Sequence, residues 1–207
     1  MLKYVIGFAG FVVMIGLIGA GVHLYKVAAR NKKEMAVYAG KEKISVKPFG
    51  KTAVVYYSLT GKTENIAQKI AEKTNAALYK IDTETPLPKG ALLHVAVKNQ
   101  IKTKEYPALK ALPDLSEYDV VFVGAPVWWY TVATPMLSFL NQTDFANKKV
   151  VPFSTQGSNV GTYFEDFAIN AKNARLLTHE SFNNLSEKYN GAVDNKIAVW
   201  LNALDID

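Results

Sequence analysis

A short polar turn, Ser58 to Thr63, holds the residues of this chain that are best suited to chemistry. Ser58, Thr60 and Thr63 supply short hydroxyl donors, and Gly61 lets the backbone approach a ligand closely. A helix pattern begins near Thr63, and the free N–H groups at a helix start attract anions. The turn therefore predicts a phosphate site. An ordinary capped turn is the alternative, because Ser and Thr are common at helix starts.

Two other stretches are placed to meet this turn. Gly124–Tyr130 and Ser154–Gly161 each follow an apolar strand pattern, and ligands of parallel sheets sit beyond the carboxyl ends of the strands. The first stretch contains three consecutive aromatic residues, whose side chains cannot all point into one core. At least one ring is expected to line a pocket and stack on a flat ligand. The alternative is that these rings cover the core or a membrane interface.

Strand and helix patterns alternate through the rest of the chain, which predicts an α/β fold with a parallel sheet and helices on both faces. The expected strands are 53–57, 77–81, 119–124, 150–153 and 175–177. Helices are expected from about residue 63 and then over 91–102, 134–141, 162–172 and 194–204. About 160 residues are enough for a single domain with a sizeable core.

An uncharged apolar run precedes this domain. Tyr4 to Tyr25 is 22 residues long and contains no Asp, Glu, Lys or Arg. At about 1.5 Å per residue, a helix of this length would cross a hydrocarbon core of about 30 Å. We interpret 1–25 as a transmembrane anchor, 26–50 as a basic juxtamembrane linker and 51–207 as the folded domain. A cleaved signal peptide is the alternative, but its apolar region is usually only about 7 to 15 residues long.

Basic residues cluster immediately after the apolar run, Lys41 and Lys43 among them. Residues 1–46 contain seven basic and two acidic residues, whereas 47–207 contain 17 and 16. The positive-inside rule therefore predicts a single-pass protein of the cell membrane with its domain in the cytoplasm. The cluster also suits anionic lipid head groups. The near-neutral domain has no basic surplus of the kind that binds nucleic acid, so no nucleic-acid partner is expected.

Cysteine is absent, which excludes disulfides, dithiol redox motifs and thiolate-bound iron–sulfur clusters. The three histidines, His23, His94 and His179, lie far apart in the sequence, so neither a metal site nor a catalytic triad is expected. Any redox chemistry must therefore come from a bound organic cofactor.

Two nucleotide-binding motifs are missing from the sequence, and their absence limits the type of nucleotide expected. Gly61-Lys62-Thr63 is similar to the end of a Walker A loop, but that motif needs glycine where this chain has Tyr56. No Gly-x-Gly-x-x-Gly follows any expected strand, so the dinucleotide fingerprint is also missing. A mononucleotide with one terminal phosphate and a flat ring system fits best.

Ser58-x-Thr60-Gly61-x-Thr63 after the first strand resembles the phosphate loop of the flavodoxins. The resemblance covers about residues 51–204 and is closest to the flavodoxins with a tryptophan pair after the third strand, here Ala125-Pro126-Val127-Trp128-Trp129. It implies a doubly wound five-stranded parallel sheet of order 2-1-3-4-5. It also implies FMN as cofactor, bound by Ser58, Leu59, Thr60, Gly61, Lys62 and Thr63 at the phosphate, Ala125, Pro126, Val127, Trp128 and Trp129 beside the ring, and Thr155, Gln156, Gly157 and Ser158 at its other edge.

The sequence departs from that family pattern in three respects. The domain is near neutral instead of acidic, the third loop has no tyrosine before Tyr163, and Lys62 stands where a small polar residue is more familiar. These departures bear on docking to a reductase, on two-sided stacking against the ring and on the charge beside the phosphate.

Three functions are compatible with these residues. The first is a membrane-tethered FMN protein that carries electrons between redox partner proteins or quinones, with the N-terminal helix in lipid. The second is an FMN-dependent NAD(P)H or quinone oxidoreductase, although no nicotinamide site is recognisable. The third is a flavin-free interaction scaffold, which the three hydroxyls of the turn disfavour. No catalytic residue is assigned, since the chemistry would belong to the flavin.

Overall fold

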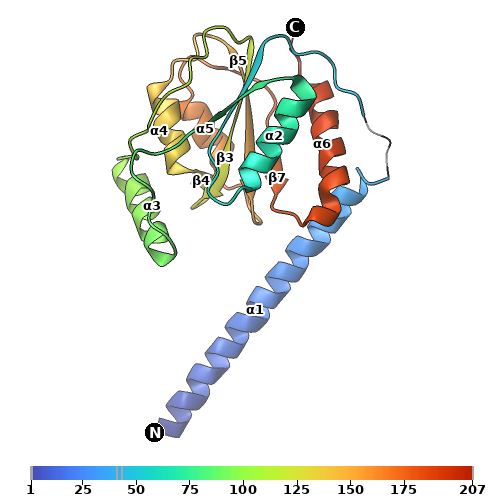
Figure 1. Cartoon of the computed structure of the whole chain (residues 1–207). Helices are drawn as coiled ribbons and strands as arrows, with labels where there is room; N and C mark the ends of the chain where they lie inside the picture. Colours follow the sequence, from blue (N-terminus) through green and yellow to red (C-terminus); the bar gives the residue numbers. More distant parts are fainter. Residues whose placement is uncertain (1, 41, 43, 207) are drawn as a thin grey trace.

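The computed structural model describes residues 2–40, 42 and 44–206, with side chains from residue 13 onward. Lys41 and Lys43, counted above among the flanking charges, lie outside the described residues, as do residues 1 and 207. Figure 1 shows the elements, which follow one another as α1 (Leu2–Ala36), β1 (Thr52–Tyr56), α2 (Lys62–Thr74), β2 (Ala77–Lys80), α3 (Ala91–Thr103), β3 (Val120–Trp128), β4 (Thr131–Val132), α4 (Thr134–Gln142), β5 (Lys149–Gln156), α5 (Tyr163–Asn170), β6 (Arg175–Leu176), β7 (Glu180–Asn183), the 3₁₀ turn η1 (Glu187–Tyr189) and α6 (Asn190–Ala203).

The parallel sheet confirms the predicted α/β class. Its strands follow the path β2-β1-β3-β5-β6. This is the predicted order 2-1-3-4-5, with β5 as the predicted fourth strand and β6 as the fifth. Within the described residues the sheet has seven strands and not five. The short β4 pairs antiparallel with β3. The predicted fifth strand, 175–177, is β6, and β7 is an additional strand that was not predicted; β6 and β7 pair with the two halves of β5.

Helices cover both faces of the sheet, as predicted. Figure 1 shows α2 and α6 on one face and α3, α4 and α5 on the other. Strand β1 is buried along its whole length. Its successive side chains pack into cores on opposite faces of the sheet: Val55 faces α4 and α5, and Val54 faces α2 and α6. This two-sided burial explains why β1 and β3 are nearly continuous apolar runs.

Strands β3 and β5 run further than their apolar patterns predict. Parallel pairing between them continues as far as Pro126 and Thr155, so residues expected in loops lie at strand ends. Gly124 and Pro126 weaken the strand signal in the sequence, because Gly has no side chain to pack and Pro has no N–H to donate. The pairing between neighbouring strands overrides this local preference.

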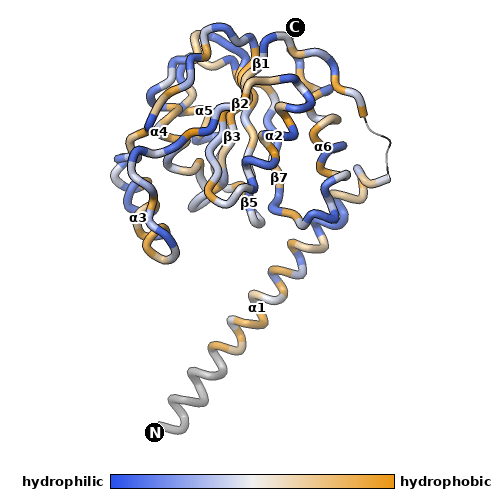
Figure 2. Tube along the Cα trace, viewed as in Figure 1, coloured by the Kyte–Doolittle hydropathy of each residue, from blue (hydrophilic) through white to orange (hydrophobic). Residues whose placement is uncertain are grey.

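Helix α1 continues into the segment 26–50 that we interpreted as a linker, covers its first part, and ends at Ala36. Figure 1 shows it as a long rod, most of which projects beyond the body of the molecule. Its stretch Val13–Ala36 is long and apolar enough to cross a membrane, a property that signal sequences near an N-terminus share. Figure 2 shows many hydrophobic residues along the coloured part of the projecting helix and polar ones where the helix reaches the body.

Candidate functional site

The predicted phosphate turn lies between β1 and α2, at the carboxyl edge of the sheet. Gly61 is the residue before the helix, with φ 81°, and a side chain at this position would meet no atom within 4 Å. Among the side chains that the structure describes, none caps the start of α2, so the ordinary capped turn is not what the structure contains. The first N–H groups of α2 are left for solvent or a ligand.

Ser58 gives the clearest sign of a ligand at this turn. Its side chain is 9% exposed, and its Oγ has no hydrogen-bond partner among the described residues. Leaving a buried hydroxyl unsatisfied costs about 1–3 kcal/mol. A group that supplies the missing hydrogen bond would recover this free energy, and a phosphate oxygen is such a group.

The third hydroxyl of the turn is used differently. Thr63 Oγ1 lies 2.7 Å from Thr155 Oγ1 on β5, and both side chains are buried. This hydrogen bond ties the start of α2 to the end of β5. It brings the turn and the third predicted stretch together, as the topology of the sheet requires.

A groove of about 220 Å³ runs across the three strand ends. It collects residues from all three stretches that the sequence analysis singled out: Leu59, Thr60, Lys62, Thr63, Pro126, Val127, Trp128, Thr155, Gln156 and Gly157. Asn184, just after β7, also lines it and was missed, because nothing in the sequence marks this polar residue as different from a loop asparagine. A second groove of about 290 Å³, lined by Gly61 among others, continues from Thr60 and Lys62 toward η1 and α6.

The other predicted residues lie around this groove and not in it. Ala125 is completely buried, and its N–H donates to the hydroxyl of Tyr163 at 3.0 Å. That hydroxyl in turn donates to the carbonyl of Phe153 at 2.9 Å. Tyr163 is therefore a core residue that joins β3 to β5, and burial raises the pKa of its hydroxyl well above the usual range. It cannot stack on a ligand in the groove.

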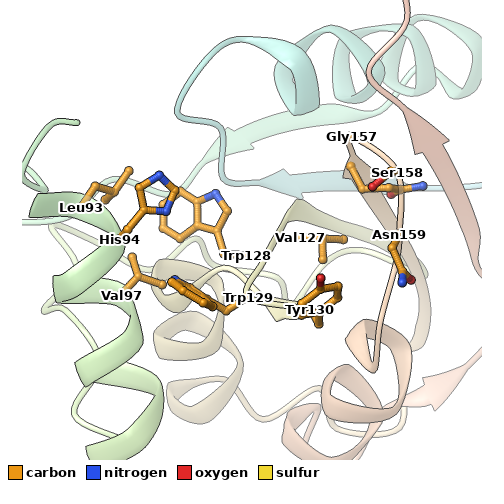
Figure 3. A pocket seen from close by; sticks show the side chains of 11 residues that line it. Leu93, His94, Val97, Val127, Trp128, Trp129, Tyr130, Gly157, Ser158 and Asn159 are labelled. Atoms are coloured by element: carbon orange, nitrogen blue, oxygen red, sulfur yellow. The ribbon is translucent and has the colours of Figure 1, made fainter. Parts of the chain in front are cut away.

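A larger cleft of about 410 Å³ adjoins the groove and shares Val127, Trp128, Gln156 and Gly157 with it. Figure 3 shows it between α3 on one side and the loop after β5 on the other, with the aromatic residues between them. Trp129 and Ser158 line this cleft, so these two predicted residues belong here. Helix α3 contributes a wall that the sequence analysis did not foresee: Leu93, His94 and Val97.

The aromatic run is a hairpin tip. Val127 pairs with Val132 and Trp128 with Thr131, which leaves Trp129 and Tyr130 as a two-residue connection with φ of 49° and 64°. Positive φ at both positions is what type I′ turns need and is normally supplied by Asn and Gly. Two bulky residues in this conformation cost about 1–3 kcal/mol each. In this conformation Trp129 is 46% exposed and Tyr130 is 60% exposed.

Neighbouring residues hold the tip in place. The carbonyl of Tyr130 accepts hydrogen bonds from the N–H of Thr162 at 2.8 Å and from its hydroxyl at 3.2 Å. Gly161 packs so closely that a side chain there would lie 2.2 Å from the same carbonyl oxygen. On the other side, Lys98 places its ammonium 5.3 Å from the centre of the Trp129 ring.

Trp128 has an aromatic neighbour on its inner side. Its ring lies 5.5 Å from that of Tyr57 in an edge-to-face arrangement of 85°. Burial and the nearby charge of Asp82 raise the pKa of Tyr57 to about 12. Tyr57 therefore stays uncharged beside Trp128, which lines the groove, even at a pH near 10.

The flavodoxin family profile matches residues 51–201. The chain belongs to the flavodoxin family. Among solved structures, this flavodoxin is similar to a flavoprotein from Bacteroides uniformis, with 27% identity, a TM-score of 0.61 and coverage of 73% of this chain and 97% of that one. It is also similar to a flavoprotein from Lactobacillus acidophilus in complex with FMN, with 25% identity, a TM-score of 0.59 and coverage of 64% and 93%.

Sequence relatives with an assigned activity match a shorter stretch of this flavodoxin. An NAD(P)H dehydrogenase (quinone) from Azorhizobium caulinodans is 34% identical over 92 residues, which are 44% of this chain and 46% of the relative. The chain thus spans about half the length of the quinone dehydrogenases that it matches.

Proposed function

We propose that this flavodoxin binds FMN and transfers electrons while tethered to the membrane by α1. The observation that carries the proposal is the buried Ser58 hydroxyl, which has no hydrogen-bond partner among the described residues although it lies in the phosphate turn. The relative from Lactobacillus acidophilus, which was solved with FMN, supports the same cofactor.

The residues at the strand ends have the chemistry to hold FMN in two parts. Ser58, Thr60 and the free N–H groups at the start of α2 suit the phosphate, and the exposed Lys62 offsets its charge. The groove walls, formed by Pro126–Trp128 and Thr155–Gly157, suit the ring and the chain that links it to the phosphate. When bound, FMN supplies the one- or two-electron chemistry.

The protein's own contribution is binding, orientation and exclusion of water. The ring of Tyr57 packs edge-to-face against Trp128, and Trp128 lines the groove with its apolar ring. Strands β3 and β5 remain paired up to Pro126 and Thr155, which makes the two walls of the groove parts of one sheet. The pair Trp128 and Trp129 also supports placement of the chain in the tryptophan-pair flavodoxins.

The membrane part of the proposal is supported by the length and apolar composition of α1. Basic residues follow the apolar run, with Lys26, Arg30, Lys32 and Lys33 all on α1. The positive-inside rule then places the domain in the cytoplasm. Protease protection in intact cells tests this orientation, and digestion of the domain from outside would contradict it.

Flavin titration of the full chain in detergent tests the cofactor. We expect FMN fluorescence to be quenched on binding, and riboflavin, which lacks the phosphate, to bind much more weakly. Lys62→Ala should weaken FMN binding, whereas Lys73→Ala, in the last turn of the same helix, should leave it unchanged. An absence of quenching would favour the flavin-free scaffold, and equal affinity for riboflavin would place the phosphate elsewhere.

An NAD(P)H:quinone oxidoreductase is the second candidate. It is favoured by the quinone dehydrogenase relatives and by the aromatic cleft beside the groove, which leaves room for a flat second reactant. Such an enzyme would oxidise NAD(P)H to NAD(P)⁺ while a quinone takes up two electrons and two protons. Direct oxidation of NADPH by the FMN-loaded chain, dependent on added quinone, would establish this activity. If NADPH is oxidised only when a partner reductase is added, the electron-carrier function is favoured instead.

A further inference from the structure

Helix α1 is joined to the body by its C-terminal turns. The guanidinium of Arg30 donates to the carbonyl of Ser158, and Asn183 donates to Asn31 Oδ1 at 2.9 Å. Met35, one turn further on, is buried in the core beneath α6. These contacts lie beside the loop after β5, so the helix is attached at the edge of the sheet that carries the candidate site.

An ion-pair cluster reinforces this attachment. Lys196 on α6 is only 5% exposed, and its ammonium lies 2.6 Å from Glu34 on α1 and 3.2 Å from Glu180 on β7. The nearly buried ammonium is thus compensated by two carboxylates, one from α1 and one from β7, and a buried charge needs such partners. Helix α1 is therefore held in a defined direction and does not swing on a loose linker.

The direction of α1 determines which side of the domain faces the membrane. Figure 1 shows that its free part extends past the carboxyl ends of the strands, on the side where α3 also projects. The side chains from Val13 to Tyr25 on this free part are exposed. If they lie in lipid, the cleft between α3 and the loop after β5 is on the membrane side of the domain.

The rim of this cleft has the composition of a membrane interface. Leu92 and Val95 lie on α3 next to the cleft-lining Leu93 and His94 and are 70% and 68% exposed, and Trp129 and Tyr130 form the strained hairpin tip that lines the cleft. Trp and Tyr are enriched at the level of lipid head groups, where their rings contact apolar chains and their polar ends remain wet. We refer to these four residues as the cleft rim.

Cations accompany the cleft rim. Lys26 and Arg30 on α1 line a space of about 370 Å³ against Ser158 and Asn159, and Lys98 lies over Trp129. Lys and Arg side chains near an anionic membrane surface are attracted by its negative potential. An apolar rim with basic neighbours matches a bilayer that contains acidic lipids.

We propose that the cleft rim is a lipid-contacting surface: with α1 across the bilayer, Leu92, Val95, Trp129 and Tyr130 enter the head-group layer. The cleft then opens onto the membrane. This inference rests on the proposed function in that α1 must span the membrane, but not on FMN binding. It favours amphiphilic reactants that reach the cleft from the lipid, over soluble proteins that would have to dock there.

Single-cysteine labelling tests the proposal, because the chain contains no natural cysteine. Three variants of the full chain, Ile18→Cys, Val95→Cys and Glu117→Cys, would each carry a fluorophore. Ile18 is on the free part of α1, Val95 is on the rim, and Glu117 is an exposed residue at the opposite edge of the sheet, beside Lys51. The vesicles would contain phosphatidylcholine and phosphatidylglycerol, with a fraction of nitroxide-labelled phosphatidylcholine.

We expect the nitroxide lipid to reduce the fluorescence of labels 18 and 95 and to leave label 117 unchanged. Loss at 18 alone would show that α1 is in the membrane while the rim is not, which overturns this inference and leaves the tether intact. No loss at 18 would overturn both. Equal loss at 95 and 117 would indicate non-specific adsorption and would also contradict the proposal. The flavin titration described above is independent of all these outcomes.

Discussion

Thr63 Oγ1 and Thr155 Oγ1 lie 2.7 Å apart in the interior, one at the start of α2 and the other near the end of β5. This hydrogen bond joins the phosphate turn to the wall of the groove. Because both side chains are buried, neither hydroxyl can turn to water if its partner is removed. The pair therefore couples the stability of the domain to the geometry of the site.

A double-mutant cycle measures this coupling. Thr63→Val or Thr155→Val alone should lower the free energy of unfolding by about 1–3 kcal/mol, because each leaves the other hydroxyl buried without its partner. The double variant should lose less than the sum of the two, since it removes both polar groups. Urea unfolding of the full chain in detergent gives the three values. Additive losses would mean that the two hydroxyls do not interact.

Replacing Ser58 separates a ligand site from a structural turn. Ser58→Ala removes the buried hydroxyl that has no partner among the described residues, so stability without FMN should stay the same or rise by up to about 1 kcal/mol. FMN affinity should fall about 10- to 100-fold, because a hydrogen bond to a charged group is worth about 1.5–3 kcal/mol. Urea unfolding without FMN measures the change in stability, and flavin titration measures the loss of FMN affinity. A variant that loses stability and binds FMN normally would contradict the assignment.

The glycines after β5 offer a matched pair of substitutions. Gly161 has φ 59° and packs against the Tyr130 carbonyl, so Gly161→Ala should lower the free energy of unfolding by more than about 1 kcal/mol and displace the hairpin tip. Gly157→Ala is the control, because its new methyl group meets no atom within 4 Å. Thermal unfolding gives the stability change, and the emission of the tryptophans reports the tip. Equal effects of the two variants would show that the close packing at Gly161 is unimportant.

Tyr57 makes a pH-dependent contribution. Its pKa is raised to about 12 in the folded protein, first by burial and then by Asp82, against about 10 when unfolded. Between pH 10 and 12 the unfolded chain loses this proton while the folded chain keeps it, so stability falls as pH rises. Tyr57→Phe should therefore reduce the decline in urea midpoint over this range, although other buried tyrosines keep part of it. An identical decline in the variant would contradict the raised pKa.

Local patterns predicted the strands and the three stretches that meet at the groove, whereas the order of the strands in the sheet came from the resemblance to the flavodoxins. Val54 and Val55 belong to a short β-branched apolar run that favours a strand buried on both faces, and Gly61 precedes an amphipathic helix. Once the strands are parallel, their carboxyl ends must meet at one edge. The turn at Ser58 and the stretch at Thr155 are therefore brought together by topology alone.

The parts that were missed depend on contacts between distant segments. His94 lies on a helix whose pattern shows only which face is apolar, and nothing local indicates that it meets Trp129. Strand β7 is short and mostly polar, and it forms because its backbone pairs with the end of β5, which brings Asn184 to the groove. Ala125 was expected beside the ligand, but its small side chain faces the core.

The burial of Met35 and the ion pair between Glu34 and Lys196 have a practical meaning for anyone who shortens this protein. A shortened version that begins after residue 50 would lose Met35 from the core and Glu34 as a counter-ion of the nearly buried Lys196. A version that begins near Lys26 keeps these contacts and omits the apolar run. The boundary between the apolar run and the folded domain thus lies inside one continuous helix, and expression trials are best designed around it.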